Sequence, residues 1–353
     1  MKNMIHGRLL VFSALFMIAI FLAGCNSRTV HGLENVNLVI SHFLPGNHPV
    51  HTDIFVEFGD RLQEVSDGRI TYQIYPSNAL GASGSQYDMA VTGEADVALS
   101  VHGYTNGRFP LVRVLELPFL TVSAEHGSRL ITDLYEEFPA FQEEHSDTVP
   151  LWLFTADPAQ IVSKDKYIER PEDMRGLRVR SPSPMGNDIL EALGAVPVSM
   201  PMGDVYEALE RGVIDAAMIP LEALYAYNLY EVSNHIVVGH FSSTPFYSVM
   251  HSATYHALTD EEREYLDRMR GVEFAVKSGQ AWDISGDKGR ELAEENQAVF
   301  IELEGELLEA WQEALEPVAQ KWIQEIEEKG LPGQAIYERA LELKEVIKAE
   351  MGQ

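Results

Sequence analysis

The chain of 353 residues is longer than one ordinary hydrophobic core requires, so its length predicts two domains. Its apolar content of 46% and charged content of 23% are typical of a globular protein. The net charge of −28 argues against a nucleic-acid partner, because binding to phosphates needs a basic surface.

The first residues predict export and a lipid anchor. Residues 1–24 contain two basic residues and then the apolar run 9–22, the pattern of a secretory signal peptide. They end in Leu-Ala-Gly before Cys25, which resembles a bacterial lipobox and implies cleavage before Cys25 and a lipid on its sulfur. A plain signal peptide is the alternative. Cys25 is the sole cysteine, which excludes an internal disulfide, and residues 25–35 are predicted to be a polar tether.

Residues 36–99 alternate between strand and helix patterns. Strands are predicted at 36–40, 70–75 and 94–99, and helices at about 54–65 and 85–93, where Gly93 is a helix stop. Such alternation predicts a parallel sheet with helices on both faces. A helix capped by Ser123 follows, and then an apolar strand at 149–154, which we expect to cross to a second lobe.

The same order recurs in the next part of the chain. Strands are predicted at 178–180, 196–200 and 213–219, and helices at 186–193 and 204–211. Both units end in a glycine, two residues, an aspartate and an apolar strand, at 93–96 and 212–215. This match predicts two related lobes whose strand carboxyl ends face a shared cleft.

The last third of the chain is predicted to be mainly helical. The chain is expected to leave the second lobe near 236–240 and to return through a strand at 246–250. Thr259 and Glu262 form a capping box, which predicts the start of one long helix running toward Gln297. A final helix is predicted at 334–350.

Arg180 is the candidate ligand anchor. It ends a predicted strand beside a helix start, a favourable place to hold an anion. A guanidinium binds a carboxylate through two parallel hydrogen bonds. A surface arginine at a strand edge is the alternative.

Four further residues are candidates for the lining of the cleft. His42 follows the first strand, Tyr104 follows the third, and Phe246 and Tyr247 begin the return strand. For the three aromatic residues, packing in the interior is the alternative. The His-Pro-Val-His run at 48–51 has no third ligand at metal spacing, so no metal site is predicted. No nucleophile elbow, P-loop, zinc-protease or dinucleotide motif points to an enzyme.

Several motifs resemble the solute-binding proteins of tripartite ATP-independent periplasmic (TRAP) transporters, of the dicarboxylate-binding DctP type. The most specific is DMRGLRVR at 173–180, followed by LGA at 193–195, MPMGDVY at 200–206 and GVID at 212–215. The resemblance covers nearly all of the chain after residue 35. It implies an α/β, two-lobed periplasmic-binding-protein-like fold, each lobe a mainly parallel sheet flanked by helices. Hinge strands and a long helix span both lobes, with 36–155 and about 246–285 in lobe I, and 156–245 and about 286–350 in lobe II.

The resemblance also implies a binding pocket. Arg180 falls on the family's arginine that pairs with a substrate carboxylate. Gln160 stands about where some members have a second arginine, and Met202 takes an often aromatic wall position. Met218 and Ile219 replace a polar pair that many members carry. The pocket is therefore expected to be more apolar, which favours a monocarboxylate with an apolar or aromatic body, or a 2-oxo acid, over a small dicarboxylate.

The function that the resemblance implies is solute capture in transport. A lipid-anchored protein on the outer face of the cytoplasmic membrane would bind a small organic acid without a cofactor. It would deliver the acid to TRAP membrane permease subunits for uptake driven by an ion gradient. A lipoprotein that reports a ligand to a sensor kinase, and the binding protein of an ATP-driven importer, are the alternatives.

Overall fold

The structure is a computed structural model that describes residues 35–352. The predicted signal peptide, Cys25 and all but the last residue of the tether lie outside the described residues. Within the described part, no helix has both the length and the apolar character needed to cross a membrane.

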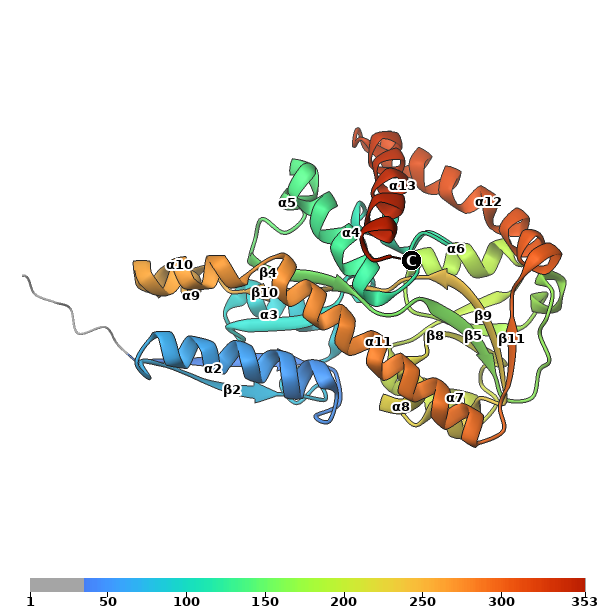
Figure 1. Cartoon of the computed structure of the whole chain (residues 1–353), viewed down its shortest axis with the longest axis horizontal. Coiled ribbons are helices and arrows are strands. Elements are labelled where there is room, and N and C mark those ends of the chain that lie inside the picture. Colours follow the sequence, from blue (N-terminus) through green and yellow to red (C-terminus); the bar gives the residue numbers. More distant parts are fainter. Residues whose placement is uncertain (1–34, 353) are drawn as a thin grey trace, which may run out of the picture. The chain divides into compact units, whose positions relative to one another are not determined.

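Two mixed sheets organise the described chain (Figure 1). Sheet A has five strands and sheet B has six. In spatial order, sheet A contains β2 (Ile70–Tyr75), β1 (Val36–His42), β3 (Val97–Val101), β10 (Pro245–Met250) and β4 (Val149–Thr155). Sheet B contains β11 (Val299–Glu302), β9 (His235–Ser242), β5 (Ala159–Ser163), β8 (Ala216–Pro220), β6 (Arg178–Ser181) and β7 (Val196–Ser199).

One strand in each sheet makes it mixed instead of mainly parallel. β1 pairs with β3 in parallel, and β6 pairs in parallel with β7 and β8. β10 is antiparallel to both of its neighbours in sheet A, and β5 is antiparallel to both of its neighbours in sheet B. The chain comes to each of these two strands directly from the other sheet, so the strand runs opposite to its neighbours. The α/β prediction of two sheets flanked by helices is confirmed with this difference.

Two short crossings join the sheets. β4 leads into β5 through residues 156–158, and β9 leads into β10 through residues 243–244. Ala156 N donates to Thr244 O at 2.9 Å, and Ser243 Oγ donates to Ala156 O at 2.9 Å. The crossings therefore lie side by side, as hinge strands require. The lobe boundaries predicted from the sequence stay a prediction.

Helices cover both sheets (Figure 1). The longer ones are α2 (Val56–Val65), α3 (Gln86–Thr92), α4 (Ala124–Glu137), α6 (Pro184–Ala192), α10 (Asp260–Met269), α11 (Val272–Glu295), α12 (Gly305–Glu328) and α13 (Gly333–Glu350). Shorter ones are α5 (Pro139–Glu143), α7 (Val205–Glu210), α8 (Glu222–Ala226) and α9 (Ser252–Ala257). Single helical turns are η1 (Val50–Phe55), η2 (Ser83–Ser85), η3 (His102–Tyr104), η4 (Val112–Glu116), η5 (Pro171–Met174), η6 (Met202–Asp204) and η7 (Leu229–Val232).

The predicted helix caps form. Ser123 Oγ accepts from His126 N at 3.1 Å at the start of α4. The Thr259 and Glu262 side chains exchange both bonds of a capping box at the start of α10.

The single long helix predicted from Thr259 toward Gln297 is wrong, because the structure divides it into α10 and α11. Gly271 lies between them with φ 94° and ψ −135°, a conformation that only glycine adopts without strain. Its N–H donates to Leu151 O of β4 at 2.7 Å, which ties the break to sheet A.

Helix α11 packs against elements of both sheets. Asp283 accepts from the N–H groups of Ala124 and Glu125 at 2.7 and 2.9 Å and so caps α4. Further along, a Cβ on Gly289 would lie 2.0 Å from Leu221 O, beside α8. Glycine at this position lets α11 approach the backbone before α8. One helix thus contacts both walls of the region between the sheets.

The glycine–aspartate repeat has the same structural role in both sheets. Gly93 and Gly212 end helices with φ of 78° and 65°. Asp96 Oδ2 then accepts from Val39 N at 2.8 Å, and Asp215 Oδ2 accepts from Arg178 N at 2.9 Å. Each aspartate side chain fixes the neighbouring parallel strand. The strands predicted at 94–99 and 213–219 therefore begin only after the aspartates, as β3 and β8.

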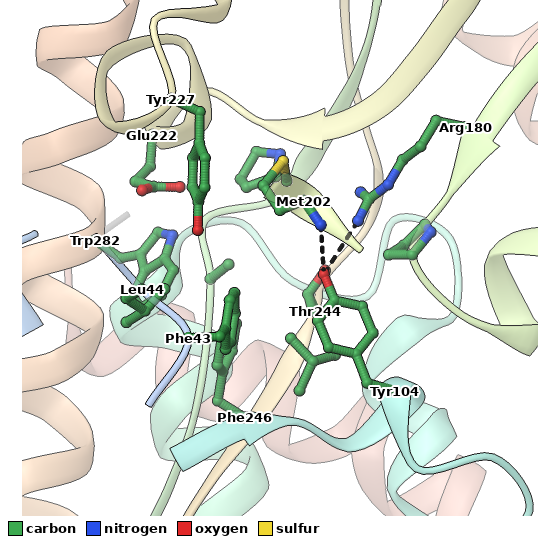
Figure 2. A pocket seen from close by; sticks show the side chains of 14 residues that line it. Phe43, Leu44, Tyr104, Arg180, Met202, Glu222, Tyr227, Thr244, Phe246 and Trp282 are labelled. Atoms are coloured by element: carbon green, nitrogen blue, oxygen red, sulfur yellow. Dashed lines mark hydrogen bonds between the residues drawn. The ribbon is translucent and has the colours of Figure 1, made fainter. Parts of the chain in front are cut away.

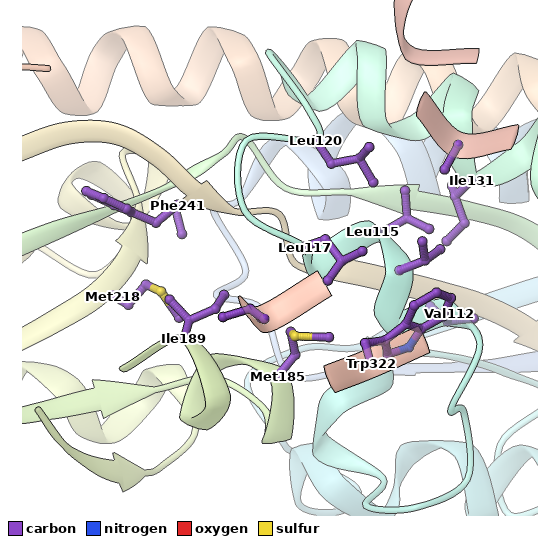
Figure 3. Close-up of a cluster of buried hydrophobic side chains, with 14 of the residues drawn as sticks. Val112, Leu115, Leu117, Leu120, Ile131, Met185, Ile189, Met218, Phe241 and Trp322 are labelled. Carbon is purple, nitrogen blue, oxygen red and sulfur yellow. The ribbon is translucent and has the colours of Figure 1, made fainter. Parts of the chain in front are cut away.

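The core is shared by the two sheets. One cluster of buried side chains joins η4 and α4 to α6, β8, β9 and α12 (Figure 3). It includes Leu115, Ile131, Met185, Phe241 and Trp322. A second cluster covers another part of sheet B, between its strands and α7 and α8. These cores hold the strand ends that carry the site.

Candidate functional site

A narrow cavity lies between the ends of the two sheets, beside the crossings (Figure 2). Both sheets, both crossings and α11 contribute to its lining, which comprises Phe43, Leu44, Val101, Tyr104, Ala156, Arg180, Pro182, Met202, Pro220, Glu222, Tyr227, Thr244, Phe246 and Trp282.

Arg180 is buried at one end of the cavity, with 1% of its surface exposed. It lies on β6. Two of the residues that hold it belong to the neighbouring strands: Met218 is in β8, and Met200 directly follows β7. Nε donates to Met200 O at 3.1 Å, and Nη1 donates to Met218 O at 2.9 Å. Nη2 donates to the Tyr104 hydroxyl at 3.2 Å. The guanidinium plane is therefore fixed before any ligand arrives.

The charge of Arg180 is not neutralised by the described chain. All three hydrogen-bond acceptors are uncharged, and no carboxylate among residues 35–352 lies within ion-pair distance of the guanidinium. Burial lowers the pKa of Arg180, while Tyr104 and Tyr227 act in the opposite direction. Arginine stays protonated in proteins, so the site holds a buried cation without a counter-ion. Such a charge is costly to bury and favours an anionic ligand.

Tyr104 connects the two walls of the cavity (Figure 2). Its hydroxyl oxygen accepts from Arg180 Nη2 at 3.2 Å and from Met202 N at 3.1 Å. Tyr104 belongs to η3, directly after β3 of sheet A, whereas both partners belong to the sheet B side. Two accepted bonds leave the phenol proton free to be donated into the cavity.

Aromatic rings form the side of the cavity between its two ends. Phe43 stacks on Phe246 with ring centroids 6.1 Å apart and planes 8° apart. The Phe43 ring also meets the Tyr104 ring edge-on at 5.6 Å, and Phe246 packs against Trp282 at 4.7 Å. With Met202 across from them, these rings form an apolar slot.

Polar groups gather again at the other end of the cavity. Glu222 begins α8, and its Oε1 lies 2.9 Å from His48 Nε2; both side chains are buried, at 2% and 0% exposure. The His48 ring packs on Trp282 with centroids 4.6 Å apart. His48 Nδ1 accepts from Val50 N at 3.1 Å, so the ring proton is on Nε2, facing Glu222.

Half of the sequence-predicted lining residues line the cavity. Arg180, Tyr104, Met202 and Phe246 do so. Tyr247 does not, because successive strand residues point to opposite faces. Its ring packs edge-on against Tyr87 and His102, at 5.2 Å from each, on the other side of sheet A.

Gln160, Ile219 and His42 also lie away from the cavity. Gln160 Oε1 accepts from Gly239 N and His240 N at 2.8 and 3.0 Å, where β9 bulges away from β5. Ile219 is directly opposite Gln160 and is buried in the second core cluster. His42 Nε2 lies 2.9 Å from His51 Nδ1, and its ring stacks on Phe55.

The sequence analysis missed Glu222, Tyr227 and Trp282. They come from α8, the turn after it and the middle of α11, so no local motif connects them. The position of Glu222 two residues after a buried strand was the available signal. Among the described residues, no cluster of three or more histidine, cysteine or acidic side chains could hold a metal ion.

Comparisons with known proteins agree with this geometry. Residues 40–325 match the bacterial extracellular solute-binding protein family 7, DctP. A solute-binding protein of Albidiferax ferrireducens is 27% identical over 258 residues, which are 70% of this chain and 75% of that protein.

Two solved structures are similar over most of the chain. One is a marine metagenome TRAP solute-binding protein specific for aromatic acid ligands, in complex with metahydroxyphenylacetate. It has a TM-score of 0.84 and 30% identity, covering 88% of this chain and 99% of that one. The other is a TRAP solute-binding protein of Rhodoferax ferrireducens with copurified benzoate, with a TM-score of 0.85, 27% identity and coverage of 90% and 99%. The chain described here therefore belongs to the DctP family of bacterial extracellular solute-binding proteins.

Proposed function

We propose that this protein captures an aromatic monocarboxylate through Arg180 and delivers it to the membrane permease subunits of a TRAP transporter. The observation that carries the proposal is the buried guanidinium, which has three uncharged acceptors and no counter-ion in the described chain. A ligand carboxylate would supply the missing charge. Two similar structures hold aromatic carboxylates, which supports the same class of ligand here.

The shape and charge of the cavity favour a monocarboxylate over a dicarboxylate. The stacked rings of Phe43 and Phe246 provide a flat apolar surface on which an aromatic body can pack. Glu222 lies at the end away from Arg180, where it would repel a second carboxylate. An acid with one charged end and an apolar body therefore matches the charges of the two ends and the apolar residues between them.

Binding is expected to favour closure of the two walls. Tyr104 from the sheet A side bonds to Arg180 and Met202 from the sheet B side, and His48 meets Glu222 in the same way. A ligand between the walls adds contacts that exist only in the closed form. Opening at residues 156–158 and 243–244 would let the ligand enter and leave.

We infer the location and the outcome of binding from the N-terminal sequence and the family. A lipid on Cys25 would hold the protein on the outer face of the cytoplasmic membrane. The ligand would be released unchanged to the permease subunits, with uptake driven by an ion gradient, instead of being converted by an enzyme.

The test is calorimetric titration of the purified protein with benzoate, phenylacetate and succinate. We expect the aromatic acids to bind and succinate to bind at least about tenfold more weakly. The Arg180→Ala variant should bind benzoate at least about 100-fold more weakly, because its carboxylate would be buried without a cationic partner. Thermal unfolding and circular dichroism of the unliganded variant check that it is folded. Unchanged benzoate affinity in a folded Arg180→Ala variant would refute the anchor.

A further inference from the structure

Asp157 lies in the crossing from β4 to β5, directly after Ala156, and does not itself line the cavity. Its side chain is buried, and its Oδ2 accepts from Leu221 N at 2.8 Å. A Cβ on Gly286 would lie 3.2 Å from the same oxygen, while the Leu221 carbonyl packs against Gly289. One carboxyl group in a crossing therefore contacts both the segment before α8 and the helix α11 behind that segment.

The position of Leu221 decides where the far end of the cavity lies, the end away from Arg180. Glu222 follows Leu221 directly in the chain, and Tyr227 follows the last residue of α8. Both side chains line the cavity, and Figure 2 shows them at the same end of it. The groups that would meet a ligand away from its carboxylate thus depend on the bond between Leu221 and Asp157.

Asp157 can hold Leu221 without a negative charge. Burial first, and then the charges of Glu222 and Asp283, raise the pKa of Asp157 well above its ordinary value. The N–H groups of Leu221 and Glu222 act in the opposite direction without reversing the shift in the pKa of Asp157. The amide oxygen of an asparagine would accept from Leu221 N in the same way. An alanine would leave this N–H without its acceptor.

We propose that Asp157 is a positioning residue of the binding site, which from the crossing fixes the segment before α8 and so sets where Glu222 and Tyr227 stand. The inference rests on the proposed function, since Glu222 selects among ligands only when Arg180 holds the carboxylate. Ala156 bonds through its N–H and its carbonyl to the second crossing, so a change at the crossings also moves Asp157. Opening of the walls is thereby coupled to the far end of the cavity.

A matched pair of ligands reports the position of Glu222. Terephthalate is benzoate with a second carboxylate opposite the first, so we expect the original protein to bind benzoate at least about tenfold more tightly. Asp157→Ala should narrow this ratio to about threefold or less, because Glu222 is then free to turn away from the ligand. Asp157→Asn should keep the ratio within about twofold of the original, because its amide oxygen still accepts from Leu221. Calorimetric titration measures both affinities.

The donor side of the contact provides an independent test. Leu221 has φ −64° and follows Pro220 of the extended strand β8, so Leu221→Pro removes the N–H and keeps the backbone conformation. Leu221→Ala is the matched control, because it shortens the side chain and keeps the N–H. We expect Leu221→Pro to narrow the ratio as Asp157→Ala does, and the double variant to narrow it no further. Leu221→Ala should leave the ratio within about twofold of the original.

Thermal unfolding of each unliganded variant checks that it is folded. An unchanged ratio in Asp157→Ala, or an equal loss in Asp157→Asn, would overturn the inference. If Asp157→Ala does not fold, the Leu221 variants decide, and equal ratios in Leu221→Pro and Leu221→Ala would overturn it. An original protein that binds both acids equally would do so too, since Glu222 would not stand where the second carboxylate lies. None of these outcomes touches carboxylate capture, which fails only when benzoate binding does not depend on Arg180.

Discussion

At one end of the cavity Arg180 is held by backbone carbonyls, whereas at the other end Tyr227 Oη and Trp282 Nε1 have no hydrogen-bond partner in the described chain and Glu222 pairs with His48. The Arg180 end is fixed by β6 and its neighbours within one sheet. The far end is assembled from α8, the turn after it and α11. A rigid anchor can therefore recognise any carboxylate of suitable size, while selection among carboxylates depends on the residues at the far end.

The largest effect that we expect is on the stability of the protein, and it comes from His42, whose Nε2 lies 2.9 Å from His51 Nδ1. Burial first, and then His51 and His48, lower the pKa of His42 to about 3. The unfolded chain takes up a proton on this residue near its ordinary pKa of about 6.5. Stability from neutral His42 is therefore fully present above pH 6.5 and is lost as the pH falls toward 3. Between pH 7 and pH 5 the loss should be about 2 kcal/mol.

Chemical denaturation of the original protein and of His42→Gln measures this effect. The variant loses the contact with His51, so it should be less stable at pH 7.5. The gap between the two proteins should narrow by about 2 kcal/mol at pH 5, because only the original protein has His42 to protonate. Buried carboxyl groups such as Glu116, whose pKa burial raises to about 7, titrate in both proteins and cancel in the comparison. A gap that stays constant or widens at pH 5 would contradict the prediction. Arg180 does not titrate here, so its end has no such dependence.

A smaller effect, on ligand affinity, is expected from removing the Tyr104 hydroxyl beside Arg180. Tyr104→Phe removes one hydroxyl that accepts from Arg180 and Met202 and keeps the ring against Phe43. We expect affinity for benzoate to fall about tenfold, since the variant loses a hydrogen bond to a charged group and a bond between the walls. Benzoate and phenylacetate should weaken by the same factor, because Tyr104 acts at the end that holds the carboxylate. An affinity loss for only one of the two acids would contradict this assignment of Tyr104.

The two ends also differ in how far the sequence predicts them. Arg180 is predictable because a strand, a turn and a helix start surround it within one short motif. Tyr104 and Phe246 are predictable because they follow or begin central strands. Trp282 and Glu222 line the same cavity only through tertiary packing of α11 against α8, which depends on glycine at position 289. No local pattern contains that contact.

The wrong expectations have similar physical causes. Strand alternation alone could not tell which of Phe246 and Tyr247 faces the cavity, since both faces of sheet A are buried there. The capping box at Thr259 correctly predicts a helix start, but the break at Gly271 depends on a bond to β4 that is distant in sequence. The repeated glycine–aspartate pattern could be predicted because each aspartate acts on the adjacent parallel strand.

Arg178 is the matched control for the anchor, with the smallest expected effect. It lies two residues before Arg180 on the same strand, but its side chain is 46% exposed and pairs with Asp215 at 3.0 Å. Exposed ion pairs contribute about 0–1 kcal/mol, because water and salt screen them. Arg178→Ala should therefore lower stability by less than about 1 kcal/mol and leave benzoate affinity within about twofold. Denaturation and titration of this variant, beside Arg180→Ala, separate the general loss of a positive charge near the cleft from the loss of the buried anchor. If both variants lose affinity equally, the attraction is long-range and the assignment of binding to the Arg180 end is wrong.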